Sequence, residues 1–340
     1  MPPLHSTPPP PKPRSARAAA FMILKIVISV GLMGWLLRSM VMRDGIDGLT
    51  ERLSTLSWPW LGACVAIHFA AVAAGTLRWR ELLLAREIDL PLSWLYRTFL
   101  VGRFFGAFTP STTGLDGYRG IEVARRTGHG ATSAAVIVIE KLFGLVGMAI
   151  VCAALLPFGL MQRLGVTAIA VALGMATIAG LGLFLVASPD RAIALARFTP
   201  GPLRKRVTSM ATALAGAGLE RGTIVRALGL GVVTHLMLSA TFVASGFALG
   251  VNVGFLELLS VGNAIVLAVL LPVSIGGVGV REGAAVLLLS GAGVATTDAV
   301  LLALLSYLTG QVPALVGGLL LLSSGASKAD KPMESSARKG

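Results

Sequence analysis

Apolar and polar residues alternate in long blocks along this chain rather than in short periodic stripes. Several blocks are mainly apolar over about 20 residues, the length that a helix needs to cross the hydrocarbon core of a bilayer. We predict full membrane spans near residues 19–40, 58–77, 131–156, 164–187, 224–250 and 298–322. The pattern predicts an all-α integral membrane protein, with a polytopic membrane domain over residues 19–322.

Two further apolar segments, near residues 94–120 and 255–294, share one repeated motif. The first reads Pro110-Ser-Thr-Thr-Gly114-Leu-Asp116-Gly117-Tyr-Arg119, and the second reads Pro272-Val-Ser-Ile-Gly276-Gly-Val-Gly279-Val-Arg281. Because proline removes a backbone donor and glycine weakens a helix, we expect these prolines and glycines to break a helix in each segment. Two re-entrant segments and six full spans give about eight membrane segments. An equally simple count lets each arm of the broken segments cross fully.

The charge pattern assigns a direction to these segments. The chain is 55% hydrophobic and carries a net charge of +13. This charge could suggest nucleic acid as a partner, but the basic residues lie mostly in the tails and connecting segments, as the positive-inside rule expects. We therefore predict no nucleic-acid partner and a multi-pass protein of the cytoplasmic membrane. Residues 1–18 and 323–340 are expected to be disordered cytoplasmic tails.

The connecting segments then place the two motifs on opposite sides. Residues 38–57 balance acids and bases and are predicted outside, whereas the connector with Arg78 and the loop 188–223 are basic and predicted inside. The first broken segment then enters from the cytoplasm and the second from the outer face. We predict two inverted repeats, near 58–156 and 224–322. A weaker echo pairs Leu61-Gly62-x-x-Val65-x-x-His68 with Leu228-Gly229-x-x-Val232-x-x-His235.

The helix breaks are candidate anion sites. Backbone groups freed in hydrocarbon must be buried in protein or face a water-filled cavity. Helix restarts aim N–H groups at each break, and arginine adds bidentate donors suited to phosphate or carboxylate. We predict an anionic-headgroup site in each half, at Arg119 and Arg281, with Asp116, Glu140 and Glu282 orienting the arginines. The alternative is that Arg119 pairs with Asp116 or Glu122, and Arg281 with Glu282, only to stabilise the turns.

Other ionisable residues lie inside the apolar segments. Glu140 and Lys141 are neighbours in one span, so each needs its own partner, and charged groups at this depth are usually functional. Arg103 either joins the headgroup site or extends to the cytoplasmic interface. His68 and His235 are candidates for proton-linked switches, or else hydrogen-bonded packing residues.

The sequence contains no catalytic constellation. It has no nucleophile elbow, no His-rich metal motif and no nucleotide phosphate loop. Its two cysteines, Cys64 and Cys152, lie in apolar runs and are expected to be packing residues. We therefore predict no catalytic residues, no metal, no cofactor and no enzymatic activity.

The motifs resemble those of a known family, the lysylphosphatidylglycerol synthase transmembrane region, or flippase-like membrane proteins. The resemblance covers residues 20–322 and rests on three stretches: Val101-Gly102 leading to Pro110–Arg119, Glu140-Lys141-Leu-x-Gly144, and Leu271-Pro272-x-Ser274-Ile-Gly276-Gly277-x-Gly279-x-Arg281-Glu282-Gly283. Leu115 stands where the family usually has glycine, and Lys141 where arginine is common. The sequence lacks the soluble aminoacyl-transferase domain of the full synthase, so lysyl transfer is not expected.

The resemblance implies inverted repeats with re-entrant helices and the movement of lipids or lipid-linked anions between leaflets. We expect a flippase that moves an anionic phospholipid or lipid-linked intermediate by alternating access, with membrane lipid as its partner. One alternative is a non-transporting scaffold for a separate lipid-modifying enzyme or glycosyltransferase. Another is a small-anion exchanger.

Overall fold

The computed structural model describes residues 16–107, 109, 113–158, 165–270, 274 and 276–329, and every regular element in these ranges is a helix. The helices are α1 (Ala16–Ser54), α2 (Trp58–Leu84), α3 (Leu92–Ala107), α4 (Thr113–Thr127), α5 (Gly130–Leu155), α7 (Val166–Ala187), α8 (Pro189–Ala196), α9 (Gly201–Ala215), α10 (Arg221–Ala248), α11 (Phe255–Val269), α12 (Val280–Ser290) and α13 (Thr296–Ala329). Five are long and apolar enough to cross a membrane, and they lie in α2, α5, α7, α10 and α13. The prediction of an all-α, multi-pass membrane protein is confirmed.

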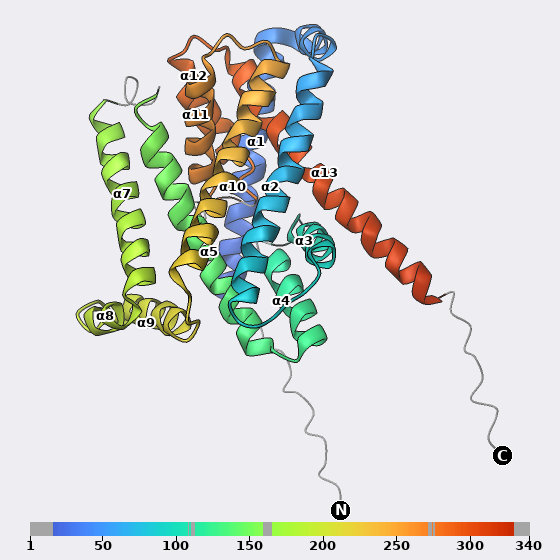
Figure 1. The fold of residues 1–340 in the computed structure, drawn as a ribbon. Helices are drawn as coiled ribbons and strands as arrows, with labels where there is room; N and C mark the ends of the chain where they lie inside the picture. The colour runs from blue at the N-terminus through green and yellow to red at the C-terminus, as the bar shows by residue number, and fades with distance from the viewer. Residues whose placement is uncertain are drawn as a thin grey trace, which may run out of the picture.

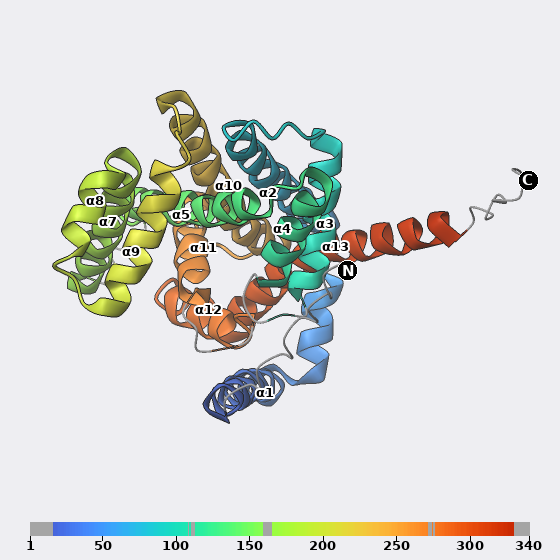
Figure 2. The same ribbon diagram turned by 90° about the horizontal axis from the view of Figure 1, so that it is seen from below.

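The bundle is built around α2 and α10, which pack against each other (Figures 1 and 2). Both α5 and α13 contact this central pair. Lipid gives little hydrophobic drive for helix association, so close approach through small residues must supply the packing. At the α5–α10 crossing a Cβ added to Gly147 would lie 2.6 Å from the carbonyl carbon of Gly231, and at the α3–α13 crossing a Cβ on Gly317 would overlap the carbonyl oxygen of Leu100.

The two apolar segments with repeated motifs are broken, as predicted. The first divides into α3 and α4 and the second into α11 and α12, while Pro110 and Pro272 themselves lie outside the described residues. Gly276 and Gly279 adopt φ angles of 61° and 81°, a left-handed conformation that favours glycine. Figure 1 shows α3 and α4 towards the end of the bundle that carries α8 and α9, and α11 and α12 towards the other end.

The prediction that Gly114 and Gly117 break the first helix is wrong, because both lie inside α4. Gly114 instead allows α4 to approach the end of α3, since a Cβ there would clash with the carbonyl oxygen of Phe105. A Cβ on Gly117 would meet nothing within 4 Å. Gly276 and Gly279 of the second motif therefore form a tight turn, whereas in the first motif only Gly114 serves close helix packing.

Three expected boundaries also differ from the structure. Helix α2 continues to Leu84, so Arg78 lies in a helix and is buried rather than in a cytoplasmic connector. Both expected tails, 1–18 and 323–340, overlap helices, because α1 starts at Ala16 and α13 ends at Ala329. Residues 1–15 and 330–340 lie outside the described residues. The loop 188–223 contains α8 and α9, which lie across the end of α7 in Figure 1.

The end of the bundle opposite α8 and α9 is held by contacts between distant segments. Arg43 of α1, just before a kink at Gly45, donates to the hydroxyl of Thr296, and Arg52, after the kink, pairs with Asp298 at the start of α13. The Ser57 N–H, just before α2, donates to the carbonyl oxygen of Ala248 at the end of α10 at 2.9 Å. The ends of α1 and α10 therefore meet the starts of α13 and α2 there.

We expect Gly317→Ala to lower the stability of the folded protein by about 1–3 kcal/mol, because the added methyl overlaps the α3 backbone and forces the two helices apart. The matched control is Gly174→Ala in α7, where a Cβ meets nothing within 4 Å. This control should be neutral or slightly stabilising, since alanine is the better helix former. Thermal unfolding in detergent compares the two variants, and equal midpoints would contradict the packing described for α3 and α13.

Candidate functional site

A buried ion-pair network joins α2, α4 and α5. Glu140 of α5 accepts hydrogen bonds from two arginines, one on each carboxylate oxygen: Arg119 of α4 at 2.9 Å and Arg78 of α2 at 3.1 Å. Arg119 is 2% exposed and Glu140 is 3% exposed. Removing one partner from such a buried pair leaves an uncompensated charge, so this network ties the three helices firmly together.

Asp116 extends the network towards the surface. It accepts a hydrogen bond from Arg119 Nη2 at 2.8 Å, and its other oxygen lies 2.6 Å from Nζ of Lys141, whose side chain is 53% exposed. Glu140 and Lys141 thus have separate partners, as their adjacent positions predicted. Arg119 makes the pair with Asp116 that the turn-stabilising alternative predicted, and it makes a second pair with Glu140. Glu122, the other partner that this alternative named, pairs with Arg125 instead.

Aromatic rings and glycines complete the surroundings of this network. The Arg119 guanidinium lies over the rings of Trp79 and Phe99, with its central carbon 4.9 Å and 4.4 Å from their centroids. A Cβ added to Gly144 would lie 3.6 Å from Nη1 of Arg78, so the glycine of the Glu140–Gly144 motif leaves room for that side chain. His235 of α10 lies beside the backbone of Gly144.

Arg78 is a member of the network that the sequence interpretation missed. Its charge was assigned to a cytoplasmic connector because the apolar run ends near residue 77. The available signal is that residues 78–84 contain neither proline nor glycine, so nothing in them ends the helix.

Arg281 of the second motif has a different environment. Its Nη2 donates to the carbonyl oxygen of Gly276 at 2.8 Å, which is a backbone group freed by the helix break. Its Nη1 lies 3.9 Å from Oε1 of Glu282, longer than a hydrogen bond. The other oxygen of Glu282 accepts from the Gly279 N–H at 2.7 Å and caps the start of α12.

One turn of α13 collects contacts from three other helices. Arg281 of α12 lies over the ring of Tyr307 at 4.2 Å, His68 of α2 lies 3.0 Å from the carbonyl oxygen of Ser306, and Arg103 of α3 donates to the carbonyl oxygen of Gly310 at 2.9 Å. Arg103 thus reaches α13 instead of pointing along α3 to the interface. We call this group of Arg103, His68, Arg281 and Tyr307 the α13 cluster.

The sequence interpretation also missed Ser306 and Tyr307. The signal for them is a short polar stretch, Ser306-Tyr-Leu-Thr309-Gly-Gln311, in the middle of the otherwise apolar last span. Polar residues at the centre of a membrane helix usually face the bundle interior, which is where these residues lie.

The predicted site residues thus form two groups. Arg119, Asp116, Glu140 and Lys141 meet in the first network, with three cations, including Arg78, against two carboxylates. Arg281, Glu282, Arg103 and His68 meet near α13, and His235 lies beside the first network. Within the described ranges no group of three or more His, Cys, Asp or Glu side chains could hold a metal ion.

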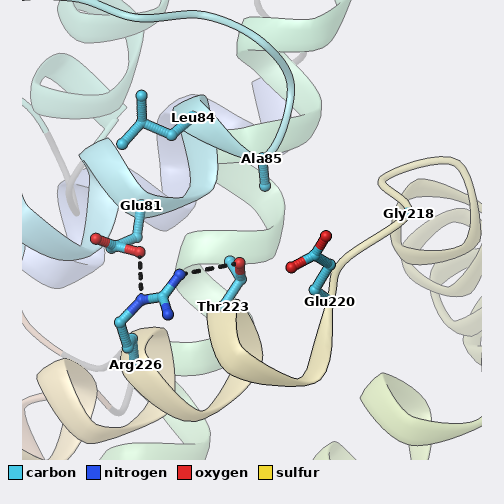
Figure 3. Close-up of a pocket in the computed structure, with 7 residues that line it drawn as sticks. All are labelled: Glu81, Leu84, Ala85, Gly218, Glu220, Thr223 and Arg226. Atoms are coloured by element: carbon cyan, nitrogen blue, oxygen red, sulfur yellow. Dashed lines mark hydrogen bonds and ion pairs between the residues drawn. The ribbon is translucent and has the colours of Figure 1, made fainter.

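A separate pocket of about 380 Å³ lies between the end of α2 and the start of α10 (Figure 3). Glu81 and Glu220 line it together with Arg226, whose Nε donates to Glu81 at 2.7 Å. Two carboxylates against one paired cation make this pocket unsuitable for an anion. None of the residues predicted for the headgroup site lines it.

Comparison with known proteins identifies a family. The family model described as "Lysylphosphatidylglycerol synthase TM region" matches residues 22–318, which is most of the chain. A search of curated proteins finds no match to this chain.

We expect Glu140→Gln to lower the free energy of unfolding by about 3–5 kcal/mol, because it leaves Arg78 and Arg119 buried with their shared countercharge removed. The control is Glu122→Gln, whose partner Arg125 has a side chain that is 75% exposed. Exposed pairs contribute little, so this variant should lose less than about 1 kcal/mol. Unfolding in detergent measures both changes, and a small effect of Glu140→Gln would show that the network does not hold the helices together.

Proposed function

The chain belongs to the lysylphosphatidylglycerol synthase transmembrane-region family, and from this premise we propose that it moves an anionic phospholipid or lipid-linked anion between the leaflets of the cytoplasmic membrane. The family description names a charged phospholipid and a transmembrane region, which makes lipid the first candidate for cargo. Arginines buried between apolar helices support this proposal, since charged groups inside membrane spans usually mark a pathway for a charged substrate.

The observation that carries the proposal is the correspondence between the helix contacts of the two halves. α3 packs against α13 as α11 packs against α5, and α2 contacts α13 as α10 contacts α5. His68 of α2 meets the α13 backbone at Ser306, and His235 of α10 faces α5 at Gly144. We propose that the halves are inverted repeats related by a pseudo-twofold axis, the architecture in which transporters rock one unit against another.

The distribution of charge supports an orientation for this arrangement. The end of the bundle with α8 and α9 carries Arg191, Arg197, Arg204, Lys205 and Arg206, and the last turn of α4 adds Arg125 and Arg126. We propose that this end is cytoplasmic, as the positive-inside rule expects, and that both termini lie on the same side. The α3–α4 break then enters from the cytoplasm and the α11–α12 break from outside.

The geometry favours Arg281 over Arg119 as the residue that meets a headgroup. Both terminal nitrogens of Arg119 already donate to carboxylates, so binding an anion there would first require breaking two buried ion pairs. Arg281 uses one terminal nitrogen to hold the turn and keeps only a distant ion pair on the other. We propose that Arg119 holds the first half rigid while Arg281 contacts cargo.

We expect Arg281→Ala to abolish leaflet transfer of fluorescent phosphatidylglycerol in reconstituted vesicles, because cargo loses its cationic contact inside the membrane. Transfer is measured as the fraction of fluorescent lipid, initially in the inner leaflet, that becomes accessible to a membrane-impermeant quencher added outside the vesicles. The control Arg125→Ala removes an exposed arginine and should transfer at the wild-type rate.

Three outcomes contradict the proposal or part of it. Unchanged transfer by a folded Arg281→Ala variant would remove the role of that residue. Wild-type protein that moves no lipid would favour the scaffold, which needs its partner enzyme. Movement of small anions without lipid would favour an exchanger.

We expect single cysteines at His129 and Ala295 to react from opposite sides of the membrane. Both positions are exposed and follow the α4 and α12 arms of the two broken segments. In sealed vesicles of known orientation, a membrane-impermeant maleimide should label His129→Cys only from the cytoplasmic side and Ala295→Cys only from the outer side. The natural Cys64 and Cys152 are both buried. They are replaced before the single cysteines are introduced, so that only the introduced thiol can react. Labelling of both positions from one side would show that the halves are not inverted.

A further inference from the structure

We infer that the helices α8 and α9 and the turn between them form an interaction surface for the anionic headgroup layer of the membrane. This α8–α9 surface consists of three apolar and five basic residues: Leu195, Phe198, Leu203, Arg191, Arg197, Arg204, Lys205 and Arg206. The inference goes beyond the proposed function, because it concerns residues outside the buried ion pairs and does not require lipid transfer.

The first support is the position of the two helices at the end of a span. The apolar part of α7 ends at Ala187, and after Ser188 the helix α8 begins at Pro189. Figures 1 and 2 show α8 and α9 lying across this end of α7, at the edge of the bundle. Helices that begin where a span ends and turn across it lie at the level of the lipid headgroups.

The second support is that α7 itself faces lipid. Only 17% of its apolar part is buried, the lowest share among the five candidate spans of the described residues. Leu173 and Leu181 of this helix are each 64% exposed. Because so little protein surrounds α7, the layer that meets α8 and α9 beside its end is the headgroup layer of the surrounding lipid.

The third support is an apolar stripe on α9 that extends past the protein against which it packs. Leu214 is part of the main hydrophobic core, and Val207 and Met210 pack against that core. Leu203 lies on the same face of the helix, one turn before Val207, but it is 49% exposed. The face of α9 that packs on the bundle therefore continues, at Leu203, towards the surrounding lipid.

The turn between the helices adds two more exposed apolar side chains. Leu195 is 54% exposed and Phe198 is 75% exposed. The guanidinium of Arg197 lies over the ring of Phe198, with its central carbon 4.7 Å from the centroid. Large apolar side chains beside arginine are typical of interfacial helices, in which the apolar groups insert between headgroups while the cations stay at the level of the phosphates.

The fourth support is the charge of the surface. Between residues 189 and 215 the five basic residues face one acidic residue, Asp190. All five are exposed, and among the described residues none of them forms an ion pair. Unpaired cations at the level of the headgroups attract anionic lipids.

The combination of residues favours a lipid surface over a soluble acidic protein. The cations alone would suit either partner. The exposed leucines and phenylalanine also need an apolar environment, which the acyl boundary below the headgroups supplies at this depth. A soluble acidic partner is therefore the alternative outcome of the test.

The first measurement is the depth of α9 side chains in a bilayer. In full-length protein whose natural cysteines are replaced, a nitroxide is attached at Leu203→Cys or at Thr212→Cys. Thr212 is exposed and lies on the opposite face of α9 from Leu203, so it is the matched control. In vesicles of phosphatidylcholine and phosphatidylglycerol, we expect oxygen to relax the label at 203 more than a water-soluble nickel complex does, and the reverse at 212.

The second measurement is the lipid preference of the surface. Protein is released from nanodiscs that contain equal amounts of phosphatidylglycerol and phosphatidylcholine, and native mass spectrometry counts the lipids that it retains. Arg204 and Arg206 flank Leu203 on the helix, so we expect Arg204→Gln with Arg206→Gln to lower the ratio of retained phosphatidylglycerol to phosphatidylcholine by about fivefold or more, the effect of losing at least one surface cation.

The matched control removes two exposed arginines from α4, Arg125→Gln with Arg126→Gln. These cations already have partners, because Arg125 pairs with Glu122 and Arg126 lies over the ring of Trp94. The control should therefore keep a lipid ratio close to that of the wild type.

Either measurement can overturn the inference. Equal relaxation of the labels at 203 and 212 by the nickel complex would show that the α8–α9 surface lies in water, and would favour a soluble acidic partner. An unchanged lipid ratio in Arg204→Gln with Arg206→Gln would show that its cations do not select anionic lipid. A protein that gives both expected results but moves no lipid would support this surface and contradict only the translocase.

Discussion

The cost of holding a guanidinium inside the membrane determines how this molecule is built. A cation at the centre of a membrane helix costs roughly 2.5–3.5 kcal/mol even by insertion scales, so each buried arginine needs nearby groups that stabilise its charge. For Arg78 and Arg119 the stabilising group is Glu140, which joins α2, α4 and α5 through both carboxylate oxygens. Small residues complete the arrangement, because Gly144 leaves the space in which the Arg78 side chain lies.

The second half meets the same cost in another way. Arg281 is stabilised by the carbonyl of Gly276 and by the ring of Tyr307, with Glu282 too far away for a hydrogen bond. A carbonyl dipole and an aromatic face attract a cation without neutralising it. One motif has thus produced two different environments. In the first, carboxylates accept from both terminal nitrogens of Arg119; in the second, Nη1 of Arg281 has no hydrogen-bond partner among the described residues. This asymmetry supports the proposal that Arg119 holds the first half rigid while Arg281 contacts cargo.

The sequence predicted much of this fold because its strongest signals are long apolar runs and paired prolines and glycines. These signals located both helix breaks and five of the six predicted spans, while the sixth, near residues 19–40, falls in α1, which is not among the helices that qualify as spans within the described residues. The separate partners of Glu140 and Lys141 followed from their adjacent positions. Arg78 was misplaced because hydropathy marks where an apolar run ends and not where a helix ends. Gly114 was misinterpreted because glycine permits both a sharp turn and a close helix contact, and only the neighbouring backbone decides between them. Gly117 lies inside α4 without such a contact. The meeting of Arg103, His68 and Arg281 on α13 joins positions more than 200 residues apart, from His68 to Arg281, which one sequence cannot reveal.

The central claim is that the two motif arginines differ in what they can bind. The most direct measurement is a structure of the protein in nanodiscs that contain phosphatidylglycerol. We predict headgroup phosphate density within hydrogen-bonding distance of Arg281 Nη1, with Arg119 still bonded to Asp116 and Glu140. Headgroup density on Arg119, with its carboxylates displaced and the α13 cluster empty, would contradict this account.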